Sequence, residues 1–354
     1  MAKLRVALVF GGRSSEHEIS CVTAGGVLGA IDRDKFEVVP IGITKGGIFV
    51  PAEDNTDKWT LNKEQLPTVE FEGKTITWLP NREIAINGET AGRIDVVFPV
   101  LHGPYGEDGT IQGFFELLDL PYVGNGVLAS AAGMDKEFTK ALFEAAGVPV
   151  TPHVVIRQHE WLRDPETALE AVKGLGGLPL FVKPARAGSS VGVSKVTDMA
   201  NFAQAVAKAF KEDDKLVVER GVVGREVEVA VLEGRNGQPT RVSVAGEIIV
   251  KGRDFYDFEA KYIDEDSVDL VIPANITAEE LQEMQAIARK AFAAIGGEGL
   301  SRVDFFLTKD GFIVNEINTM PGFTRLSMFP SLWQASGIAY RELITELLEL
   351  ALKK

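Results

Sequence analysis

The stretch SRVDFFLTKDGFIVNEINTMPGFT, residues 301–324, predicts two β-strands joined by a tight turn. Apolar and polar residues alternate on both sides of the turn, which is typical of strands with two different faces. Residues i and i+2 of a strand share a face, so Arg302 joins Asp304 and Glu316 joins Asn318. The chemistry of the hairpin depends on whether these two polar pairs point the same way.

The length of the turn decides that question. A two-residue loop at Asp310-Gly311 would send the polar pairs to opposite faces. A three-residue loop with Gly311 in the left-handed conformation, or a compensating bulge, would set Asp304 opposite Glu316. Opposed carboxylates repel each other unless a cation lies between them, so this pairing predicts a divalent metal site that includes Asn318. The alternative is a solvated hairpin face.

The length and charge of the chain restrict its class. A chain of 354 residues is long for one core, and we expect two or three domains. The formal net charge is −14, from 37 basic and 51 acidic side chains, which argues against a nucleic-acid or anionic-membrane partner. An anionic nucleotide would therefore have to be attracted by local lysines.

Cysteine content and apolar runs indicate the compartment. Cys21 is the only cysteine, so no intrachain disulfide can form, and a reducing cytoplasm is expected. The apolar run at residues 6–10 is too short for a signal peptide. No apolar stretch approaches the ~20 residues that span a bilayer. We expect a cytoplasmic protein without a membrane partner.

The N-terminal part has the pattern of a parallel α/β domain. Residues 4–10 are mostly apolar, as in a buried parallel strand, and Gly11-Gly12 then leads into a helix that reaches Ala30. Gly, Pro and Asn interrupt short strand-like pieces over residues 45–92. We interpret this segment as a β-rich insertion and find no candidate site residue in it.

A second buried strand is predicted at residues 94–101, and it ends at His102 in a glycine-rich turn. Ligands of α/β proteins bind at the carboxyl ends of strands, so His102 is a candidate ligand contact. It could equally cap the helix predicted at residues 110–118, and the segment alone leaves both roles open.

Two lysines are placed as candidate anion ligands. Lys136 lies in the first turn of a helix that Asp135 can cap, where the helix dipole disfavours a cation unless an anion is near. Lys183 ends a strand before the Gly/Ser-rich loop 185–193, whose backbone N–H groups could fold over phosphates. No GxxxxGK[ST] loop occurs. A solvated lysine and an ordinary turn are the alternatives.

Residues 251–262 combine aromatic and basic side chains and are followed by a polar run. We interpret this segment as a lid that can lay Lys261 and Tyr262 over a site and exclude water. An aromatic core loop is the alternative.

Seven motifs, taken in order, resemble the ATP-grasp enzymes and, closely, the D-alanine–D-alanine ligase family. They are GGRSSEHEIS (11–20), HGPYGEDGTIQG (102–113), MDK (134–136), VKPARAGSSVGVSKV (182–196), VERGVVGREVEVAVL (218–232), FYDFEAKY (255–262) and SRVDFF with NEINTMPGFTRLS (301–327). They run from the first strand nearly to the last helix, so the resemblance covers almost the whole chain.

The resemblance implies a fold of class α/β, with α+β character in its ATP-grasp part. An N-terminal parallel α/β domain (1–125), with the β-rich insertion at about 45–92, would precede a two-lobed ATP-grasp fold. The central lobe would span 126–222. The C-terminal lobe, 223–354, would carry the metal site and a lid loop, 251–272.

The resemblance also implies a reaction. Two D-alanines would be joined with ATP, through an acyl phosphate, to give D-alanyl-D-alanine for peptidoglycan precursors. ATP would be the co-substrate, and two Mg²⁺ ions, replaceable by Mn²⁺, would assist; a homodimer is expected. The alternatives are ligation of D-alanine to D-lactate or D-serine, an ATP-grasp carboxylase and a non-catalytic ATP-binding protein.

Roles for individual residues follow from the same resemblance. The implied metal ligands are Asp304, Glu316 and Asn318, with Glu316 bridging the ions. The implied nucleotide-binding residues are Lys136, Lys183, Ser189, Ser190, Glu219, Arg220, Val222, Glu226, Tyr256 and Lys261. Arg220 departs mildly from the family, in which a lysine often stands beside adenine.

For the amino acids, the resemblance implies Glu16 as ligand of the first ammonium, His102 near the first carboxylate and Ser327 as ligand of the second carboxylate. Arg302 and the Gly322 amide would form the oxyanion site. The implied catalytic residues are Glu16, Ser189, Tyr262, Arg302 and Gly322, with Ser189 and Tyr262 linking the phosphate loop, the lid and Glu16. A tyrosine at 262 goes with an amine as second substrate.

Overall fold

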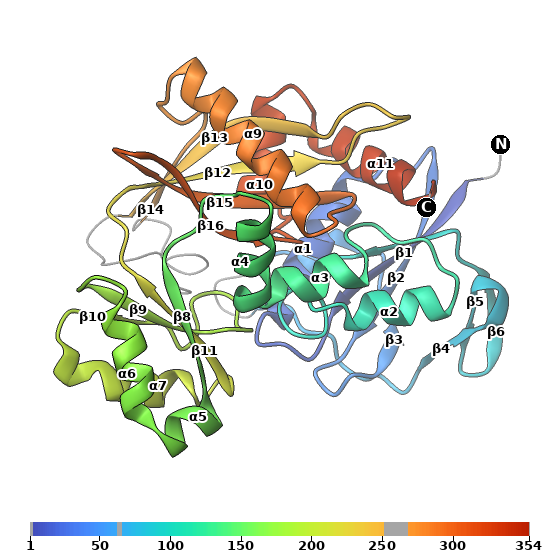
Figure 1. Ribbon diagram of the computed structural model, residues 1–354. Coiled ribbons are helices and arrows are strands. Elements are labelled where there is room, and N and C mark those ends of the chain that lie inside the picture. Colours follow the sequence, from blue (N-terminus) through green and yellow to red (C-terminus); the bar gives the residue numbers. More distant parts are fainter. Residues whose placement is uncertain (1–2, 62–65, 251–267, 354) are drawn as a thin grey trace.

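The structure is a computed structural model that describes residues 3–61, 66–250 and 268–353 (Figure 1). Its first sheet consists of β1 (Leu4–Gly11), β2 (Phe36–Ile43), β3 (Phe49–Pro51) and β7 (Val96–Pro99), in the order β3-β2-β1-β7. β1 pairs parallel with both β2 and β7, so the parallel strand predicted at residues 4–10 is confirmed. The helices that follow in this part are α1 (His17–Ala30), α2 (Thr110–Leu117) and α3 (Val127–Met134).

The segment 45–92 is rich in strands, as predicted. Beyond β3, it holds the short helices η1 (Thr56–Trp59) and η2 (Pro80–Arg82) and a small antiparallel sheet of β4 (Ile76–Leu79), β5 (Glu83–Ile86) and β6 (Glu89–Arg93). The segment is tied into the N-terminal core. Trp59 packs edge-on against Phe10 of β1, with ring centroids 4.8 Å apart.

The central part (green in Figure 1) contains an antiparallel sheet with the strand order β10-β9-β11-β8. Its strands are β8 (His153–Arg157), β9 (Leu180–Pro184), β10 (Ser194–Val196) and β11 (Lys215–Arg220). Its helices are α4 (Lys136–Ala145), α5 (Gln158–Arg163), α6 (Pro165–Lys173), η3 (Met199–Asn201) and α7 (Phe202–Ala209). Asp135 caps α4 as predicted, because its side chain accepts from the backbone N–H groups of Glu137 and Phe138.

The C-terminal sheet has the strand order β14-β13-β12-β15-β16. Its strands are β12 (Arg225–Leu232), β13 (Arg241–Val250), β14 (Val268–Val271), β15 (Leu300–Thr308) and β16 (Gly311–Asn318). The helices of this part are α9 (Ala278–Ala294), α10 (Met328–Ala335) and α11 (Tyr340–Ala351). A capping box starts α9: Thr277 Oγ1 accepts from Glu280 N at 3.1 Å, and Glu280 Oε2 accepts from Thr277 N at 2.7 Å.

Period-two alternation gives the C-terminal sheet two different faces. Val227 and Val303 belong to the buried cluster that includes Met284 of α9. Glu228 and Asp304, one position further along these strands, point to the other face and lie opposite each other in the β12–β15 register. The sheet therefore presents a row of acidic side chains on the face that α9 does not cover.

The predicted hairpin is present, but its turn differs from the expected one. Thr308 pairs with Gly311, so the loop contains two residues, Lys309 and Asp310, and the predicted three-residue loop is wrong. The register shifts between Asp304 and Phe305, which is the compensating bulge. Beyond it Asp304 lies opposite Glu316 and Arg302 opposite Asn318, as the metal site requires. The two-residue Asp310-Gly311 loop is excluded.

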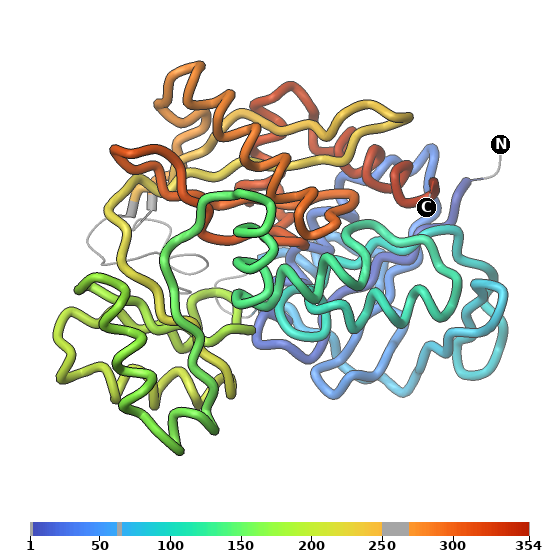
Figure 2. The backbone as a smooth tube through the Cα atoms, in the orientation of Figure 1, coloured from blue at the N-terminus to red at the C-terminus, as the bar shows by residue number. Residues whose placement is uncertain are grey.

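The C-terminal helix packs against the N-terminal part of the chain. α11 packs against α1 and β7, and Figure 2 shows the red tube of α11 beside the blue N-terminal strands. Phe10 of β1 and Leu343 of α11 belong to one buried cluster, together with Phe323 and Phe329 from the segment after the hairpin. This shared core fixes the segment after the hairpin beside β7, where the rings of Phe323 and Phe98 lie 5.6 Å apart.

Candidate active site

A cavity of about 1050 Å³ lies where the N-terminal, central and C-terminal sheets meet. Every predicted site residue that falls within the described ranges lines it. These residues are Glu16, His102, Lys136, Lys183, Ser189, Ser190, Glu219, Arg220, Val222, Glu226, Arg302, Asp304, Glu316, Asn318, Gly322 and Ser327. Tyr256, Lys261, Tyr262 and most of the predicted lid lie outside the described residues, and the end of the lid segment, Val268–Val271, is strand β14.

The hairpin contributes a dense charge cluster to the cavity wall. Arg302 donates from Nε and Nη2 to the two carboxylate oxygens of Asp304, at 2.7 Å each, and its Nε also lies 2.8 Å from Glu228 Oε2. The amide of Asn318 donates to Asp304 Oδ2 at 2.9 Å. Asp304 is buried, so the alternative of a solvated hairpin face is wrong. Burial alone would lower the pKa of Arg302, but Asp304 and Glu228 hold it well above its usual value.

The hairpin fits a magnesium site by its donor chemistry. Asp304 and Glu316 offer carboxylate oxygens from opposed positions, and Asn318 offers a carboxamide oxygen on the same face. Mg²⁺ is typically held by one or two carboxylates together with substrate phosphates, so two carboxylates and an amide suffice. Among the residues that the structure describes, no group of three or more His, Cys, Asp and Glu side chains forms an all-protein metal cage. Two carboxylates and one carboxamide leave coordination positions that phosphate oxygens can fill, so the hairpin suits an ion that arrives with a phosphate ligand.

A second cluster surrounds Glu219 at the end of β11. Lys183 Nζ donates to Glu219 Oε2 at 2.6 Å, and Lys140 Nζ lies 2.9 Å from Glu219 Oε1. Burial alone would raise the pKa of Glu219, but the two ammonium groups hold it well below its usual range. Burial lowers and Glu219 raises the pKa of Lys183, and the net direction is upward. Glu219 and Lys183 are therefore both charged near neutral pH.

Lys136 lies at the start of α4, beside the loop that follows β9. Its backbone N donates to Ala185 O at 3.0 Å and its Nζ donates to Ala187 O at 2.8 Å. Desolvation by the surrounding protein lowers the pKa of Lys136, and nearby Lys183 adds to the effect although Glu316 opposes it. An ammonium held in this way gains from an anion in the cavity.

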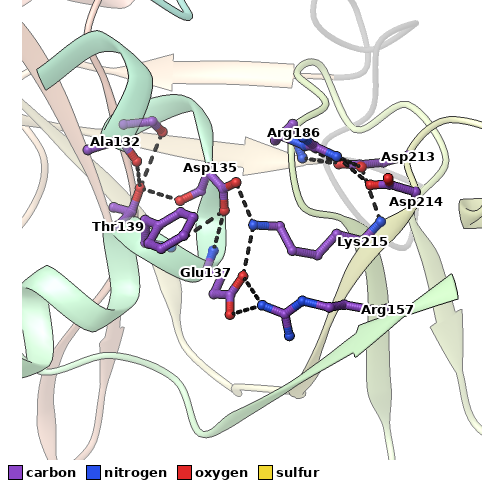
Figure 3. Close-up of polar contacts among 11 residues, drawn as sticks. Ala132, Asp135, Glu137, Thr139, Arg157, Arg186, Asp213, Asp214 and Lys215 are labelled. Atoms are coloured by element: carbon purple, nitrogen blue, oxygen red, sulfur yellow. Dashed lines mark hydrogen bonds and ion pairs between the residues drawn. The ribbon is translucent and has the colours of Figure 1, made fainter. Parts of the chain in front are cut away.

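A charge network at its N-terminus fixes α4 to the central sheet (Figure 3). Lys215 of β11 bonds Asp135 Oδ2 at 2.5 Å and Glu137 Oε2 at 2.8 Å, on either side of Lys136. Arg157 of β8 donates to both carboxylate oxygens of Glu137, at 2.8 and 3.1 Å. Two strands therefore hold the helix turn that carries Lys136.

Glu16 and Ser189 join the N-terminal part to the loop after β9. Ser189 Oγ donates to Glu16 Oε1 at 2.6 Å. Ser189 and Ser190 both have positive φ, 49° and 59°, so the loop turns sharply and aims Ser189 across the cavity. The Glu16 backbone N–H is held by Ser14 Oγ at 3.1 Å.

His102 contacts the cavity and does not cap a helix. The cap of α2 is Gly109, without a side-chain bond, so the capping alternative is wrong. His102 Nδ1 lies 3.4 Å from Glu107 Oε1, and Nε2 lies 3.3 Å from Thr23 Oγ1. Burial alone would lower the pKa of His102, but Glu107 raises it above the usual value. A protonated imidazole here suits a carboxylate ligand.

Ser327 and Gly322 lie together after the hairpin. Ser327 Oγ accepts from Thr324 N at 3.1 Å and is 2.7 Å from Thr324 Oγ1. A Cβ at Gly322 would come within 3.1 Å of Ser327 Oγ, so a side chain at Gly322 would crowd this hydroxyl. The turn thus presents a backbone amide and a hydroxyl side by side.

Several residues at the cavity wall, or directly behind it, were not anticipated from the sequence. Lys140 lies one helical turn after Lys136, and this i, i+4 spacing could have revealed it. Glu228 is two positions from Glu226 on the same strand face and could have been found by the same argument. Trp59 and Leu61 of the insertion also line the cavity, and nothing in the sequence indicated that.

Comparisons with known proteins agree with this geometry. The family models "D-ala D-ala ligase N-terminus" and "D-ala D-ala ligase C-terminus" match residues 5–125 and 142–349. D-alanine–D-alanine ligases of Arthrobacter sp. (strain FB24) and Streptomyces avermitilis are each 52% identical to the chain, over 100% and 99% of it and 95% of each relative. That of Mycobacterium ulcerans is 48% identical, over 99% of the chain and 96% of the relative.

Solved structures share the architecture. The VanG D-Ala:D-Ser ligase of Enterococcus faecalis superposes with a TM-score of 0.85 at 34% identity, covering 99% of this chain and 100% of that one. The D-alanine–D-alanine ligase of Coxiella burnetii gives 0.84 at 32% identity, covering 100% and 95%. The fold is the ATP-grasp fold of a ligase. With both family models and full-length relatives in agreement, the chain belongs to the D-alanine–D-alanine ligase family.

No helix in the described part of the chain is long and apolar enough to cross a membrane.

Proposed function

We propose that the chain joins two D-alanines to D-alanyl-D-alanine with hydrolysis of ATP to ADP and phosphate. The observation that supports this best is the convergence of three groups on one cavity: the acidic hairpin, the lysines at 136 and 183, and Glu16 with Ser189. The acidic hairpin and the two lysines suit the metal-bound phosphates of a nucleotide. Glu16 with Ser189 suits the ammonium group of an amino acid.

The reaction has two steps. A carboxylate oxygen of the first D-alanine attacks the γ-phosphorus, and the bond to the bridging oxygen of ADP breaks, which leaves an acyl phosphate. The amine of the second D-alanine then attacks the acyl carbon, phosphate leaves and a proton is released. Both steps gain from a site that neutralises phosphate, stabilises an oxyanion and excludes water.

The residues of the chain divide this work. Lys136 and Lys183 neutralise phosphate oxygens, and Glu219 with Glu226 binds the nucleoside. Glu16, in contact with Ser189, binds the first ammonium. His102, whose pKa is raised by Glu107, attracts the carboxylate of the same amino acid. Arg302 and the Gly322 amide stabilise the tetrahedral oxyanion, and Ser327 binds the second carboxylate. The remaining proposed nucleotide contacts are Ser190, Arg220, Val222, Tyr256 and Lys261, with Tyr262 closing the lid.

Asp304, Glu316 and Asn318 would hold two Mg²⁺ ions, or Mn²⁺ in their place. When bound, such ions would neutralise the negative charge that develops on the phosphate oxygens of ATP. Asn318 would present its carboxamide oxygen to the metal, although its nitrogen faces Asp304 here.

A phosphate-release assay with D-alanine and with L-alanine tests the function. We expect release stimulated by D-alanine only, reduced at least about a hundredfold by Glu316→Gln. Glu279→Gln, at an exposed position of α9, is the matched control and should keep the parent rate. ATP binding without D-alanine-stimulated turnover would instead support a non-catalytic ATP-binding protein.

The same assay identifies the second substrate. The VanG structure is that of a D-Ala:D-Ser ligase, so D-serine and D-lactate are assayed as partners of D-alanine. We expect D-alanyl-D-alanine to dominate. A larger yield of the D-serine or D-lactate product would overturn the assignment of the second substrate but not that of the first.

We also propose the organisation of the chain in the cell: three domains at 1–125, 126–222 and 223–354, with a lid loop at 251–272, in a cytoplasmic homodimer. The family alone supports the homodimer. Sedimentation equilibrium measures the assembly, and a monomer mass at working concentration would exclude it.

A further inference from the structure

Lys140 is a buried lysine of α4 that lies behind the cavity wall and pairs with Glu219, a residue that lines the cavity. Its ammonium lies 2.9 Å from Glu219 Oε1, and both side chains are almost completely excluded from solvent. The other oxygen of Glu219 accepts from Lys183 at 2.6 Å. Each carboxylate oxygen has two lone pairs, so Glu219 can accept a further hydrogen bond from a ligand while both lysines remain in place.

The two lysines are not equivalent. Lys183 also lies 3.4 Å from Asn315 Oδ1, beside the hairpin, and phosphate neutralisation is its proposed role. A bound nucleotide would therefore share the charge of Lys183. Lys140 pairs with Oε1 of the Glu219 carboxylate, whereas Lys183 bonds the other oxygen, Oε2. Lys140 is thus the cation that remains with Glu219 when Lys183 serves the phosphates.

The helix that carries Lys140 is held firmly. Asp135 caps α4, and Lys215 and Arg157 hold its first turn to β11 and β8 (Figure 3). Lys136 and Lys140 stand four residues apart on this helix, so they share one face. The position of the Lys140 ammonium relative to β11 is therefore set by the fold and not by a mobile surface side chain.

We propose that Lys140 is a positioning residue that keeps Glu219 ionised and oriented as a hydrogen-bond acceptor, and thereby makes the site select adenine over 6-oxopurines. The inference rests on the proposed function, in which Glu219 contacts the purine. An ionised carboxylate accepts from the 6-amino group of adenine but cannot donate to the 6-oxo group of hypoxanthine. A protonated or turned Glu219 could donate to that oxygen, and discrimination would fall.

The low pKa of Glu219 supports the same conclusion, since an ionised carboxylate in a buried place needs nearby cations. Removal of Lys140 leaves Lys183 as the cation paired with this carboxylate among the described residues. We then expect Glu219 to act less strictly as a hydrogen-bond acceptor, in addition to any loss of stability.

The test is the ratio of dissociation constants of IDP and ADP, measured by calorimetry on the full chain. Hydrogen bonds to charged groups correspond to roughly tenfold or more in binding. We expect the parent to prefer ADP by at least about this factor, Lys140→Met to lose most of the preference, and Lys140→Arg to keep more of it. Lys290→Met, at an exposed position of α9, is the matched control and should keep the parent ratio.

A double variant separates positioning from folding. Lys140→Met alone leaves a buried carboxylate short of one partner and could destabilise the chain, whereas Glu219→Gln with Lys140→Met removes both charges. If Lys140 acts through Glu219, Lys140→Met changes the IDP/ADP ratio in the parent but not in the Glu219→Gln background. The IDP/ADP ratios of Glu219→Gln and of the double variant can be compared even if Lys140→Met alone folds poorly. A difference between these two ratios would show that Lys140 acts independently of Glu219.

The outcomes distinguish the inference from the function on which it rests. An unchanged ratio in Lys140→Met, or an equal change in the Glu219→Gln background, would overturn the role of Lys140. A parent protein that binds neither nucleotide would overturn the proposed function itself.

Discussion

The hydroxyl of Ser189 donates to Glu16 Oε1 at 2.6 Å, although 173 residues separate the two in sequence. Ser189 belongs to the loop after β9 in the central part, and Glu16 to the turn before α1. The bond therefore joins the loop proposed to cover the phosphates to the carboxylate proposed to hold the first amino acid. A ligand bound at the loop can therefore affect binding at Glu16, and the reverse, through this hydrogen bond.

Ser189→Ala should weaken the use of D-alanine more than the binding of nucleotide. The change leaves Glu16, a buried carboxylate, without one donor, and a hydrogen bond to a charged group contributes about 1.5–3 kcal/mol. We expect kcat/KM for D-alanine to fall roughly tenfold or more, while the calorimetric affinity for ADP stays within about twofold. Ser194→Ala, on β10 and outside the cavity lining, should change neither quantity. An ADP affinity that falls in parallel would show that Ser189 serves the nucleotide directly.

The affinity for ADP should decrease as the pH rises through the lowered pKa of Lys136. Desolvation lowers this pKa in the free protein, and a bound phosphate favours the charged ammonium, so binding is accompanied by proton uptake above that pKa. The cation is present below the pKa and lost above it, which places the decline on the alkaline side. Arginine stays protonated, so Lys136→Arg should move the decline to higher pH.

Calorimetry without added divalent metal measures this effect, because no metal-bound water can then titrate. Buffers of different ionisation enthalpy report the protons taken up on binding. A parent profile that is flat up to the titration of free lysine, or an identical decline in Lys136→Arg, would contradict the assignment.

Lys215→Met should destabilise the central part of the chain. Lys215 bonds Asp135 and Glu137 (Figure 3). Its ammonium also lies 4.6 Å from the centre of the Phe138 ring. Removing one partner of a buried ion pair leaves an uncompensated charge and costs about 3 kcal/mol. The urea midpoint should fall accordingly.

Lys173→Met provides the comparison for that variant. Lys173 forms an exposed i, i+3 pair with Glu170, which should contribute less than about 0.5 kcal/mol. Equal urea midpoints for the two variants would mean that the network in Figure 3 contributes no more than a surface pair.

The hairpin shows how far sequence reasoning reached and where it stopped. Alternation placed Arg302, Asp304, Glu316 and Asn318 correctly, because the side-chain period of a strand is independent of its partners. The sequence left the turn open between a three-residue loop and a compensating bulge, because both give the same pairing beyond the bulge, and the structure has the bulge. Only the three-dimensional structure shows which of the two turns is present.

The missed lysines show a different limit. Lys140 and Lys215 are both buried and paired with carboxylates from distant parts of the chain. From sequence alone, a lysine on a helix or at a strand end is expected to be solvated. The i, i+4 spacing places Lys140 on the helix face of Lys136, but whether a lysine becomes an internal counter-ion depends on packing between elements. Family resemblance supplied Lys136 and Lys183 but not these two.

Arg302→Lys should lower kcat while leaving nucleotide affinity nearly unchanged. Arg302 holds Asp304 through two parallel bonds of 2.7 Å and also contacts Glu228, and a lysine ammonium cannot reproduce this planar fork. The proposed role of the guanidinium is to stabilise the oxyanion, which exists only in the tetrahedral intermediate and the transition states beside it. Losing one such donor typically costs about 10²–10³ in rate.

The measurement is kcat for D-alanine-dependent phosphate release together with the dissociation constant of ADP. Arg289→Lys, on the exposed face of α9, controls for the change of residue type and should keep the parent kcat. If Arg302 serves only to orient Asp304, then Arg302→Lys should instead weaken metal-dependent ADP binding and lower kcat only in proportion. A selective loss of kcat would assign the guanidinium to the transition state, because an interaction absent from the ground state cannot appear in the binding constant.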